Sequence, residues 1–283
     1  MNTIIEITDL ACQSGRRYLV NHINWRVEKG EHWILFGLNG CGKTTLLSIA
    51  AGFKGQTKGK VAVFGEEYND DDIFDLRRKI GWVSSSFFDK YLSWESALSI
   101  VLSGVSGTLS MSSGITDRDV KKAIMLLKKL RLGSKIDQPF ALMSKGERQC
   151  VLIARALISD PEILILDEPG TGLDIYAREY ILTAVDDLAK NTDMTIIYVT
   201  HYIEEILPSF DKTLLMKDGR IYKQGKTADL FSDEIFSAFL NYPVNISCSE
   251  AGHLQASLEV AASFRDNDKS CLTADREGGD QDE

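Results

Sequence analysis

Gly37-Leu38-Asn39-Gly40-Cys41-Gly42-Lys43-Thr44 is the stretch that decides the fold, because it matches the pattern G-x-x-x-x-G-K-[ST]. It follows the apolar run His32–Phe36, which is typical of a buried strand, and it precedes Thr45–Ala51, which has a helical pattern. In that setting the glycines let successive backbone N–H groups face phosphate oxygens, and the helix start adds a positive dipole end. We expect Lys43 to reach the β- and γ-phosphates of a nucleoside triphosphate. The Thr44 hydroxyl is expected to bind Mg²⁺. A glycine turn that holds Lys and Thr by chance is the alternative, and the strand and helix disfavour it.

Two further apolar runs, Ile163–Leu166 and Thr195–Thr200, are separated by the helical segment Tyr176–Lys190. Apolar strands that alternate with helices predict an α/β fold with a parallel sheet covered on both faces. The first run ends in Asp167 and Glu168. Beside a triphosphate, Asp167 suits Mg²⁺, and Glu168 suits the positioning or deprotonation of the attacking water. Acids that simply face solvent at a strand end are the alternative.

The regions outside this core have other patterns. Near the start of the chain, and again at residues 23–27, apolar residues alternate with polar ones, as in the strands of a sheet. We interpret residues 86–147 as a helical insertion, because residues 92–102 and 120–130 have helical patterns joined by a Ser/Gly-rich loop. Lys217-Asp218-Gly219 predicts a hairpin turn. The predicted organisation is a domain over residues 1–240 and an acidic, disordered tail over residues 243–283.

Composition places the chain among ordinary globular proteins, with 44% hydrophobic and 26% charged residues in a length of 283. No apolar run approaches the roughly 18 residues that span a bilayer, and the first residues lack the basic and apolar regions of a signal peptide. The five cysteines are scattered, which favours reduced thiols in a cytosol. The net charge of −9 does not favour a nucleic-acid partner, which usually needs a basic surface.

Taken together, these motifs resemble the ATP-binding cassette (ABC) family over about residues 3–240. The family's signature, usually L-S-G-G-Q, has its counterpart in Met143-Ser144-Lys145-Gly146-Glu147, where Lys145 departs from the pattern. Ser144 and Glu147 also form the pattern of a capping box. The resemblance implies that Ser144 and Gly146 meet the γ-phosphate of a nucleotide held by a partner subunit. It also implies that Asp174 ends a loop at the dimer contact and that His201 senses the γ-phosphate.

Two positions depart from the family. Ser85 stands where a glutamine usually links the metal site to the helical insertion. The aromatic residue that stacks on adenine is not assigned, because the expected position is Ser14 and Tyr18 lies four residues away. The stretches Ser84–Ser86 and Ile196–Pro208 resemble a bacterial subgroup linked with molybdate or iron-compound uptake, which does not identify a substrate.

The resemblance implies an α/β P-loop NTPase fold with a RecA-like parallel core, an N-terminal antiparallel β sub-domain and the helical insertion. One phosphate loop and one signature imply a head-to-tail dimer that binds two ATP molecules. We expect an ATPase subunit of a transporter, on the cytoplasmic face of the membrane, driving separate transmembrane subunits. A soluble ABC ATPase in translation or DNA repair is the main alternative; an ATP-sensing scaffold and a P-loop kinase fit fewer of the motifs.

The predicted site residues fall into three sets. The nucleotide ligands are Gly37, Leu38, Asn39, Gly40, Cys41, Gly42, Lys43, Thr44, Thr45, Ser144, Gly146 and Asp174. The catalytic residues are Glu168 and His201, and the Mg²⁺ ligands are Thr44 and Asp167.

Overall fold

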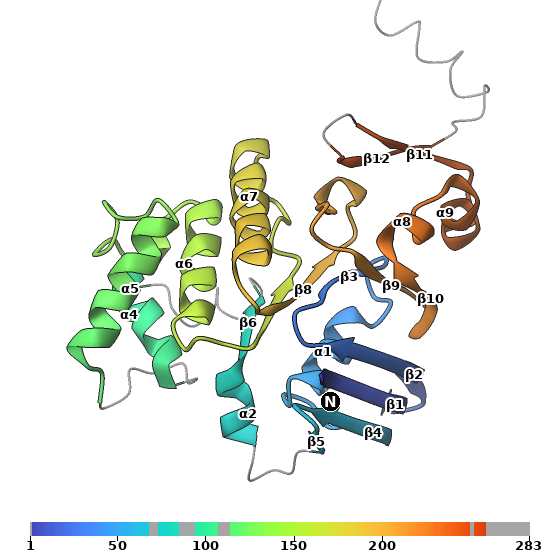
Figure 1. Cartoon of the computed structure of the whole chain (residues 1–283), viewed down its shortest axis with the longest axis horizontal. Coiled ribbons are helices and arrows are strands. Elements are labelled where there is room, and N and C mark those ends of the chain that lie inside the picture. The colour runs from blue at the N-terminus through green and yellow to red at the C-terminus, as the bar shows by residue number, and fades with distance from the viewer. Residues whose placement is uncertain (1, 68–72, 85–93, 107–113, 250–251, 259–283) are drawn as a thin grey trace, which may run out of the picture.

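The computed structural model describes residues 2–67, 73–84, 94–106, 114–249 and 252–258, which form three sheets and the helices around them (Figure 1). The N-terminal sheet is antiparallel, with strand order β2-β1-β4-β5. Its strands are β1 (Thr3–Ser14), β2 (Arg17–Glu28), β4 (Lys58–Val63) and β5 (Glu66–Glu67). Ile7 lies opposite Trp25 on one side and Val61 on the other, so the alternating apolar residues share a buried face. The predicted antiparallel sub-domain is confirmed.

The main sheet has six strands in the order β10-β9-β3-β8-β7-β6. Its strands are β3 (His32–Phe36), β6 (Ile80–Ser84), β7 (Ile163–Asp167), β8 (Thr195–Thr200), β9 (Lys212–Lys217) and β10 (Arg220–Lys226). All neighbours are parallel except β9 and β10, which form the predicted hairpin. Phe36 pairs with Thr200, and Asp167 pairs with Val199. The carboxyl ends of β3, β7 and β8 therefore meet at one edge, and the segments that follow them lie close together.

The main sheet separates two apolar clusters, because successive side chains of a strand point to opposite faces. In β3, Ile34 and Phe36 belong to one cluster, whereas Trp33 and Leu35 belong to the other. All residues of β7 and β8 are buried, as their unbroken apolar sequences predict. Burial of each such large apolar side chain contributes about 1.5–3 kcal/mol, which makes this sheet a stable platform for the loops at its edge.

Helices cover the main sheet and extend from one end of it (Figure 1). They are α1 (Lys43–Ala50), α2 (Ile73–Lys79), α4 (Ala97–Ser103), α5 (Asp117–Lys129), α6 (Lys145–Leu157), α7 (Ile175–Asn191), α8 (Thr227–Leu230) and α9 (Asp233–Leu240), with 3-10 turns η1 (Gly104–Ser106), η2 (Phe140–Leu142) and η3 (Ile203–Glu205). Helices α4, α5 and α6 pack against one another. Helix α5 begins with a capping box formed by Thr116 and Asp119. None of the helices within the described ranges has the length and apolar character needed to cross a membrane.

The start of the predicted tail is folded, which corrects the expectation of disorder for these residues. Strands β11 (Val244–Cys248) and β12 (Leu254–Leu258) form an antiparallel pair, and β12 packs on η3. The backbone N–H of Val244 donates to Ser237 Oγ at 2.9 Å, and that of Ile246 donates to Asp233 Oδ1 at 2.6 Å. One reason is apolar burial, since Val244 is only 2% exposed. The other is the position of the charges, because only one of the tail's nine acids precedes residue 259. Residues 259–283 lie outside the described part.

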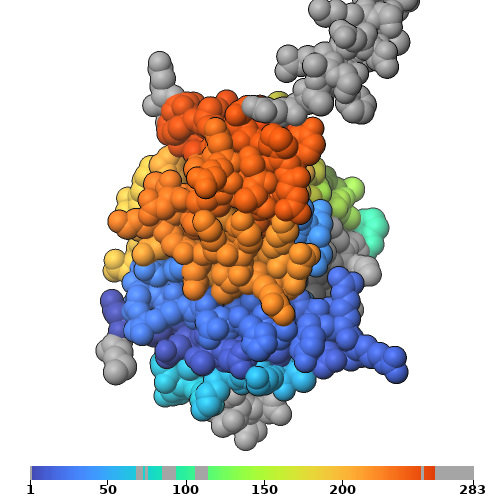
Figure 2. All heavy atoms as spheres, turned by 90° about the vertical axis from the view of Figure 1, so that its right-hand side faces the viewer, coloured from blue at the N-terminus to red at the C-terminus, as the bar shows by residue number. Residues whose placement is uncertain are grey.

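The C-terminal elements also complete one face of the molecule. Figure 2 shows the segment from β9 to α9, in orange, lying directly above the N-terminal strands, in blue. The contact includes a hydrogen bond from Gln224 Nε2 to the Asn24 carbonyl at 3.2 Å. The Gly219 carbonyl, in the turn between β9 and β10, accepts from the Asn21 N–H at 2.8 Å, and the Gly219 N–H donates to the Cys41 carbonyl, so the turn lies beside the phosphate loop.

Candidate functional site

The loop Gly37–Gly42 joins the carboxyl end of β3 to the start of α1. Gly42 caps α1 with φ 105°, a left-handed conformation that favours glycine. A Cβ atom at this position would lie 2.7 Å from the Leu19 carbonyl oxygen, so the neighbouring β2 strand also excludes a side chain. The helix hydrogen bond from the Leu46 N–H to the Gly42 carbonyl, at 2.9 Å, starts at this glycine. The loop thus directs the amino end of α1 toward the cleft.

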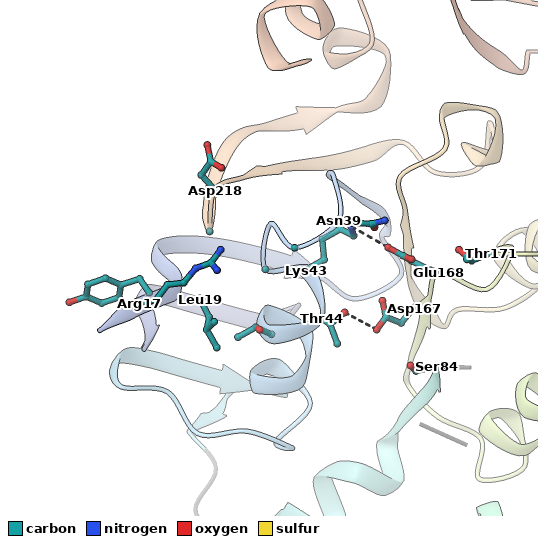
Figure 3. Close-up of a pocket in the computed structure, with 15 residues that line it drawn as sticks. Arg17, Leu19, Asn39, Lys43, Thr44, Ser84, Asp167, Glu168, Thr171 and Asp218 are labelled. Atoms are coloured by element: carbon teal, nitrogen blue, oxygen red, sulfur yellow. Dashed lines mark hydrogen bonds and ion pairs between the residues drawn. The ribbon is translucent and has the colours of Figure 1, made fainter. Parts of the chain in front are cut away.

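Lys43 is the buried cation of the loop, with 5% of its surface exposed. Its Nζ donates to the Gly37 carbonyl at 2.7 Å and to the Leu38 carbonyl at 3.3 Å. The same Nζ lies 3.2 Å from Glu168 Oε1. These carbonyls and the carboxylate hold the ammonium group at the inner end of the cleft, where it can meet an anionic ligand (Figure 3).

Asp167 and Thr44 form a pair of oxygen donors across the cleft. The Thr44 hydroxyl donates to Asp167 Oδ2 at 3.1 Å (Figure 3). Asp167 is 7% exposed, and within the described residues its buried Oδ1 has no hydrogen-bond partner. Burial raises the pKa of Asp167 to about 6, with a further rise from Glu168, while the Thr44 hydrogen bond and Lys43 oppose the rise. A buried carboxylate with an unsatisfied oxygen fits a hard divalent cation such as Mg²⁺.

Glu168 and His201 extend from the ends of β7 and β8. Glu168 has φ 51°, a conformation that is costly for a residue with a side chain, and its N–H donates to the Val199 carbonyl at 3.1 Å. Its Oε1 lies 3.3 Å from His201 Nδ1, within ion-pair distance although the pair lacks hydrogen-bond geometry. The His201 ring packs on the Tyr202 ring, with centroids 4.1 Å apart. The Glu168 carboxylate therefore lies between the loop lysine and this histidine.

Lys43, Thr44, Asp167 and Glu168 line a cleft of about 840 Å³, whereas the predicted residues Gly37, Leu38, Cys41 and His201 are not part of its lining. Of the predicted residues, the cleft lining includes Asn39, Gly40, Gly42, Lys43, Thr44, Thr45, Asp167 and Glu168. Sequence reasoning did not identify the remaining lining residues as site residues: Arg17, Tyr18, Leu19, Ser84, Thr171, Asp218 and Gly219 (Figure 3). The sequence predicted a hairpin turn at Asp218 and Gly219. It gave no indication that this turn contacts the phosphate loop, which it does through a hydrogen bond from the Gly219 N–H to the Cys41 carbonyl at 3.0 Å.

The sequence left two positions of the family pattern in question, the residue that stacks on adenine and Ser85 at the usual glutamine position. Between Ser14 and Tyr18, it is Tyr18 that lines the cleft, with 51% of its surface exposed. Ser85 lies outside the described residues, whereas its neighbour Ser84 ends β6 and pairs with Asp167 across the sheet.

The signature residues are organised as a helix start. The Ser144 hydroxyl accepts from the Glu147 N–H at 3.3 Å and the Ser144 N–H donates to the Glu147 carboxylate at 3.0 Å, which completes the expected capping box. Asp174 caps α7 by accepting from the Ala177 N–H at 2.8 Å. Gly146 lies against Ala177, and a Cβ on this glycine would approach that side chain to 2.8 Å. Ser144, Gly146 and Asp174 are outside the cleft lining, so one chain does not bring them to the phosphate loop.

Cys41 lies inside the loop with 7% of its surface exposed. Burial is the main cause that raises the pKa of its thiol, and Lys43 only partly opposes the rise. A thiol activated by the helix start is one interpretation of the sequence; a small residue that fits the loop is the other, and the raised pKa favours it.

Comparisons with known proteins agree with this geometry. The family model described as "ABC transporter" matches residues 20–171. The uncharacterized ABC transporter ATP-binding protein YlmA of Bacillus subtilis (strain 168) is 40% identical over 245 residues, which cover 86% of this chain and 93% of YlmA. The energy-coupling factor transporter ATP-binding protein EcfA of Pediococcus pentosaceus is 30% identical, with 83% of this chain and 82% of EcfA covered.

Solved structures show the same fold. A structure described as an inward-facing conformation of a metal-chelate type ABC transporter has a TM-score of 0.75 and 28% identity, covering 91% of this chain and 99% of the matched chain. The dimeric cassette MJ0796, in a post-hydrolysis state with ADP and phosphate, has a TM-score of 0.69 and 26% identity, covering 79% and 98% of the two chains. The α/β P-loop architecture expected from the sequence is confirmed.

Proposed function

The chain belongs to the ABC transporter family of ATP-binding proteins, and from this we propose how its residues bind and hydrolyse ATP for a transporter. The observation that carries the proposal is the meeting of Lys43, Asp167, Glu168 and His201 at one edge of the main sheet. Asp167, Glu168 and His201 lie at the ends of β7 and β8, and Lys43 begins α1 after the loop that follows β3, so neighbouring parallel strands bring the four side chains together. The transporter matches favour this role over a soluble ATPase of translation or DNA repair.

Each residue has a role in the proposed reaction. Backbone N–H groups of the loop and the amino end of α1 bind the phosphates, and Lys43 leaves its carbonyl partners to pair with the β- and γ-phosphate oxygens. Glu168 orients the attacking water and accepts its proton. His201, at the end of β8, contacts the γ-phosphate side of the site and keeps Glu168 in place.

Mg²⁺ fits the pair of Thr44 and Asp167. Their two oxygens lie 3.1 Å apart, and Asp167 Oδ1, which has no hydrogen-bond partner among the described residues, leaves a lone pair available. Two protein oxygens, together with water and phosphate oxygens, are the usual ligands of Mg²⁺ in nucleotide sites. When bound, the ion would neutralise part of the triphosphate charge.

A second copy of the chain completes the site. Ser144, Gly146 and Asp174 lie at helix starts outside the cleft, among exposed apolar side chains such as Ile175 at 75% and Leu142 at 66%. A head-to-tail pair would place these helix starts over the partner's triphosphate, where the N–H groups and the Ser144 hydroxyl bind the γ-phosphate. The dimeric cassette structures support this arrangement.

The proposed role places the chain beside a membrane-embedded partner. We assign the chain to the cytoplasmic face of the membrane, because it needs ATP and because related proteins are named as transporter ATP-binding subunits. Affinity capture from detergent-solubilised membranes is expected to recover a polytopic membrane protein. Recovery of ribosomal proteins alone would overturn the transporter role.

Glu168→Gln tests the two-chain ATPase. The amide keeps the shape of Glu168 but cannot accept a proton, so hydrolysis should fall by about 100-fold while ATP stays bound. Gel filtration at micromolar concentration should then show a dimer with ATP and a monomer without nucleotide. A Glu168→Gln protein that stays monomeric with saturating ATP and Mg²⁺ would contradict the model.

A further inference from the structure

Glu205, at the end of η3, is a buried carboxyl group that the proposed chemistry does not use. It is 1% exposed, although it follows the exposed Glu204 in the sequence. Its Oε2 accepts from the Thr200 hydroxyl at 2.6 Å and from the Tyr198 hydroxyl at 3.2 Å. Burial of a carboxyl group is costly unless hydrogen bonds compensate for the lost water. The two hydroxyl donors on Oε2 provide such bonds and hold the carboxyl group in a defined position.

The Thr200 hydroxyl links Glu205 to the backbone of Tyr202, the residue that follows His201. Thr200 Oγ1 donates to Glu205 and accepts from the Tyr202 N–H at 3.0 Å. The two hydrogen bonds bracket His201, whose ring packs on that of Tyr202. The position of His201 Nδ1, 3.3 Å from Glu168 Oε1, therefore depends on a hydrogen-bond relay that ends at Glu205.

The other oxygen of Glu205 faces the segment that follows Glu168. Glu205 Oε1 is buried and, within the described residues, has no hydrogen-bond partner. It lies so close to Gly170 that a Cβ atom there would collide with it. Gly170 is two residues beyond Glu168, and only a residue without a side chain leaves room for the carboxyl group. Glu205 thus contacts both segments that carry the proposed catalytic side chains.

We propose that Glu205 is a positioning residue, which through Thr200 and Gly170 holds His201 and Glu168 at the separation that hydrolysis requires. The inference rests on the proposed ATPase function and deepens it. Burial, the largest influence, raises the pKa of Glu205, while its Thr200 and Tyr198 hydrogen bonds oppose that rise. Small displacements of a catalytic group can cost large factors in rate, so loss of the relay should lower turnover more than binding.

Steady-state ATPase kinetics of four variants test the relay. Glu205→Leu removes the acceptor, and Thr200→Val removes the hydroxyl at nearly constant volume. Each should lower kcat per nucleotide-binding site by about tenfold and leave KM and the Kd for a fluorescent ATP analogue within about twofold. Thr200→Ser and Glu205→Gln keep the hydroxyl and an acceptor oxygen, and they should retain kcat within about threefold. Glu204→Gln, on the exposed neighbour, is the matched control and should equal the wild type.

The double variant Thr200→Val/Glu205→Leu decides whether the two residues act together. If they form one relay, the double variant should lose about the same tenfold as either single variant. A loss of about 100-fold would show independent effects and would overturn the relay. Unchanged kcat in Glu205→Leu or Thr200→Val would also overturn it. If Glu205→Leu does not unfold cooperatively, Thr200→Val and its Ser counterpart carry the same test.

The experiments distinguish failure of the positioning role of Glu205 from failure of the proposed ATPase function. A wild-type protein without ATPase activity would contradict the function itself. An active wild type whose Glu205 and Thr200 variants lose ATP affinity and thermal stability but keep kcat would contradict only the positioning role.

Discussion

Asp167 offers a prediction whose size follows from its burial. Its pKa is raised from an ordinary value of 3.8 to about 6, with burial as the largest cause. The difference between 3.8 and about 6 corresponds to about 3 kcal/mol by which the folded protein opposes ionisation of this carboxyl group. Because the folded protein holds the proton more tightly than the unfolded chain, this contribution lowers stability as pH rises through the interval from about 4 to 6. At pH 8 the ionised carboxyl group lowers the free energy of unfolding by the full amount of about 3 kcal/mol. At pH 4.5 it lowers it by about 1 kcal/mol.

Asp167→Asn removes the charge and keeps an oxygen that can accept from the Thr44 hydroxyl. In nucleotide-free protein with a chelator, we expect this variant to raise the free energy of unfolding by about 3 kcal/mol at pH 8. The gain should fall to about 1 kcal/mol at pH 4.5. Urea unfolding followed by circular dichroism measures both values. The same variant should lose Mg²⁺-dependent ATP hydrolysis, so stability and activity change in opposite directions.

Asp193→Asn is the matched control, because Asp193 is exposed in the segment between α7 and β8. It should change the free energy of unfolding by less than about 0.5 kcal/mol at either pH. If Asp167→Asn destabilises the nucleotide-free protein at pH 8, the ionised carboxylate must be favourable in the fold. The argument from burial would then be wrong.

Three further predictions concern the loop and the two-chain site. Gly42→Ala should weaken binding of a fluorescent ATP analogue by at least about tenfold, because the left-handed φ and the Leu19 carbonyl both oppose a Cβ atom. Gly55→Ala is the control and should leave this binding unchanged, because a Cβ atom at Gly55 would enter open space. Peptide mapping after iodoacetamide treatment at pH 7.5 should find Cys41 unmodified while the exposed Cys248 reacts, and rapid modification of Cys41 would refute the assignment of a buried, raised-pKa thiol. Lys43→Ala and Ser144→Arg should each be inactive, but a mixture should recover about a quarter of wild-type activity, because random pairing gives half mixed dimers with one complete site each; no recovery would argue against a site shared by two chains.

Much of the site could be predicted from local sequence. The loop from Gly37 to Thr44 carries its own chemistry, since the glycines, the lysine and the hydroxyl act within one strand-to-helix connection. Strands β7 and β8 were evident as unbroken apolar runs, and each leads directly into its functional side chain, Glu168 or His201. Parallel order then makes their carboxyl ends converge, which is why sequence alone placed these residues in one site.

The chain's tertiary structure decided the features that depend on contacts between distant segments. Packing of Val244 against the core decided that β11 and β12 form, although the predicted tail is acidic overall. The contact of Gly219 with Cys41 and that of Glu205 with Gly170 join segments with no shared pattern. Sequence periodicity reports which face of a strand or helix is buried, and it carries no information about which distant atom fills the space opposite. For that reason the nucleotide loop could be predicted from the sequence, while the hydrogen-bond relay behind His201 could be found only in the folded chain.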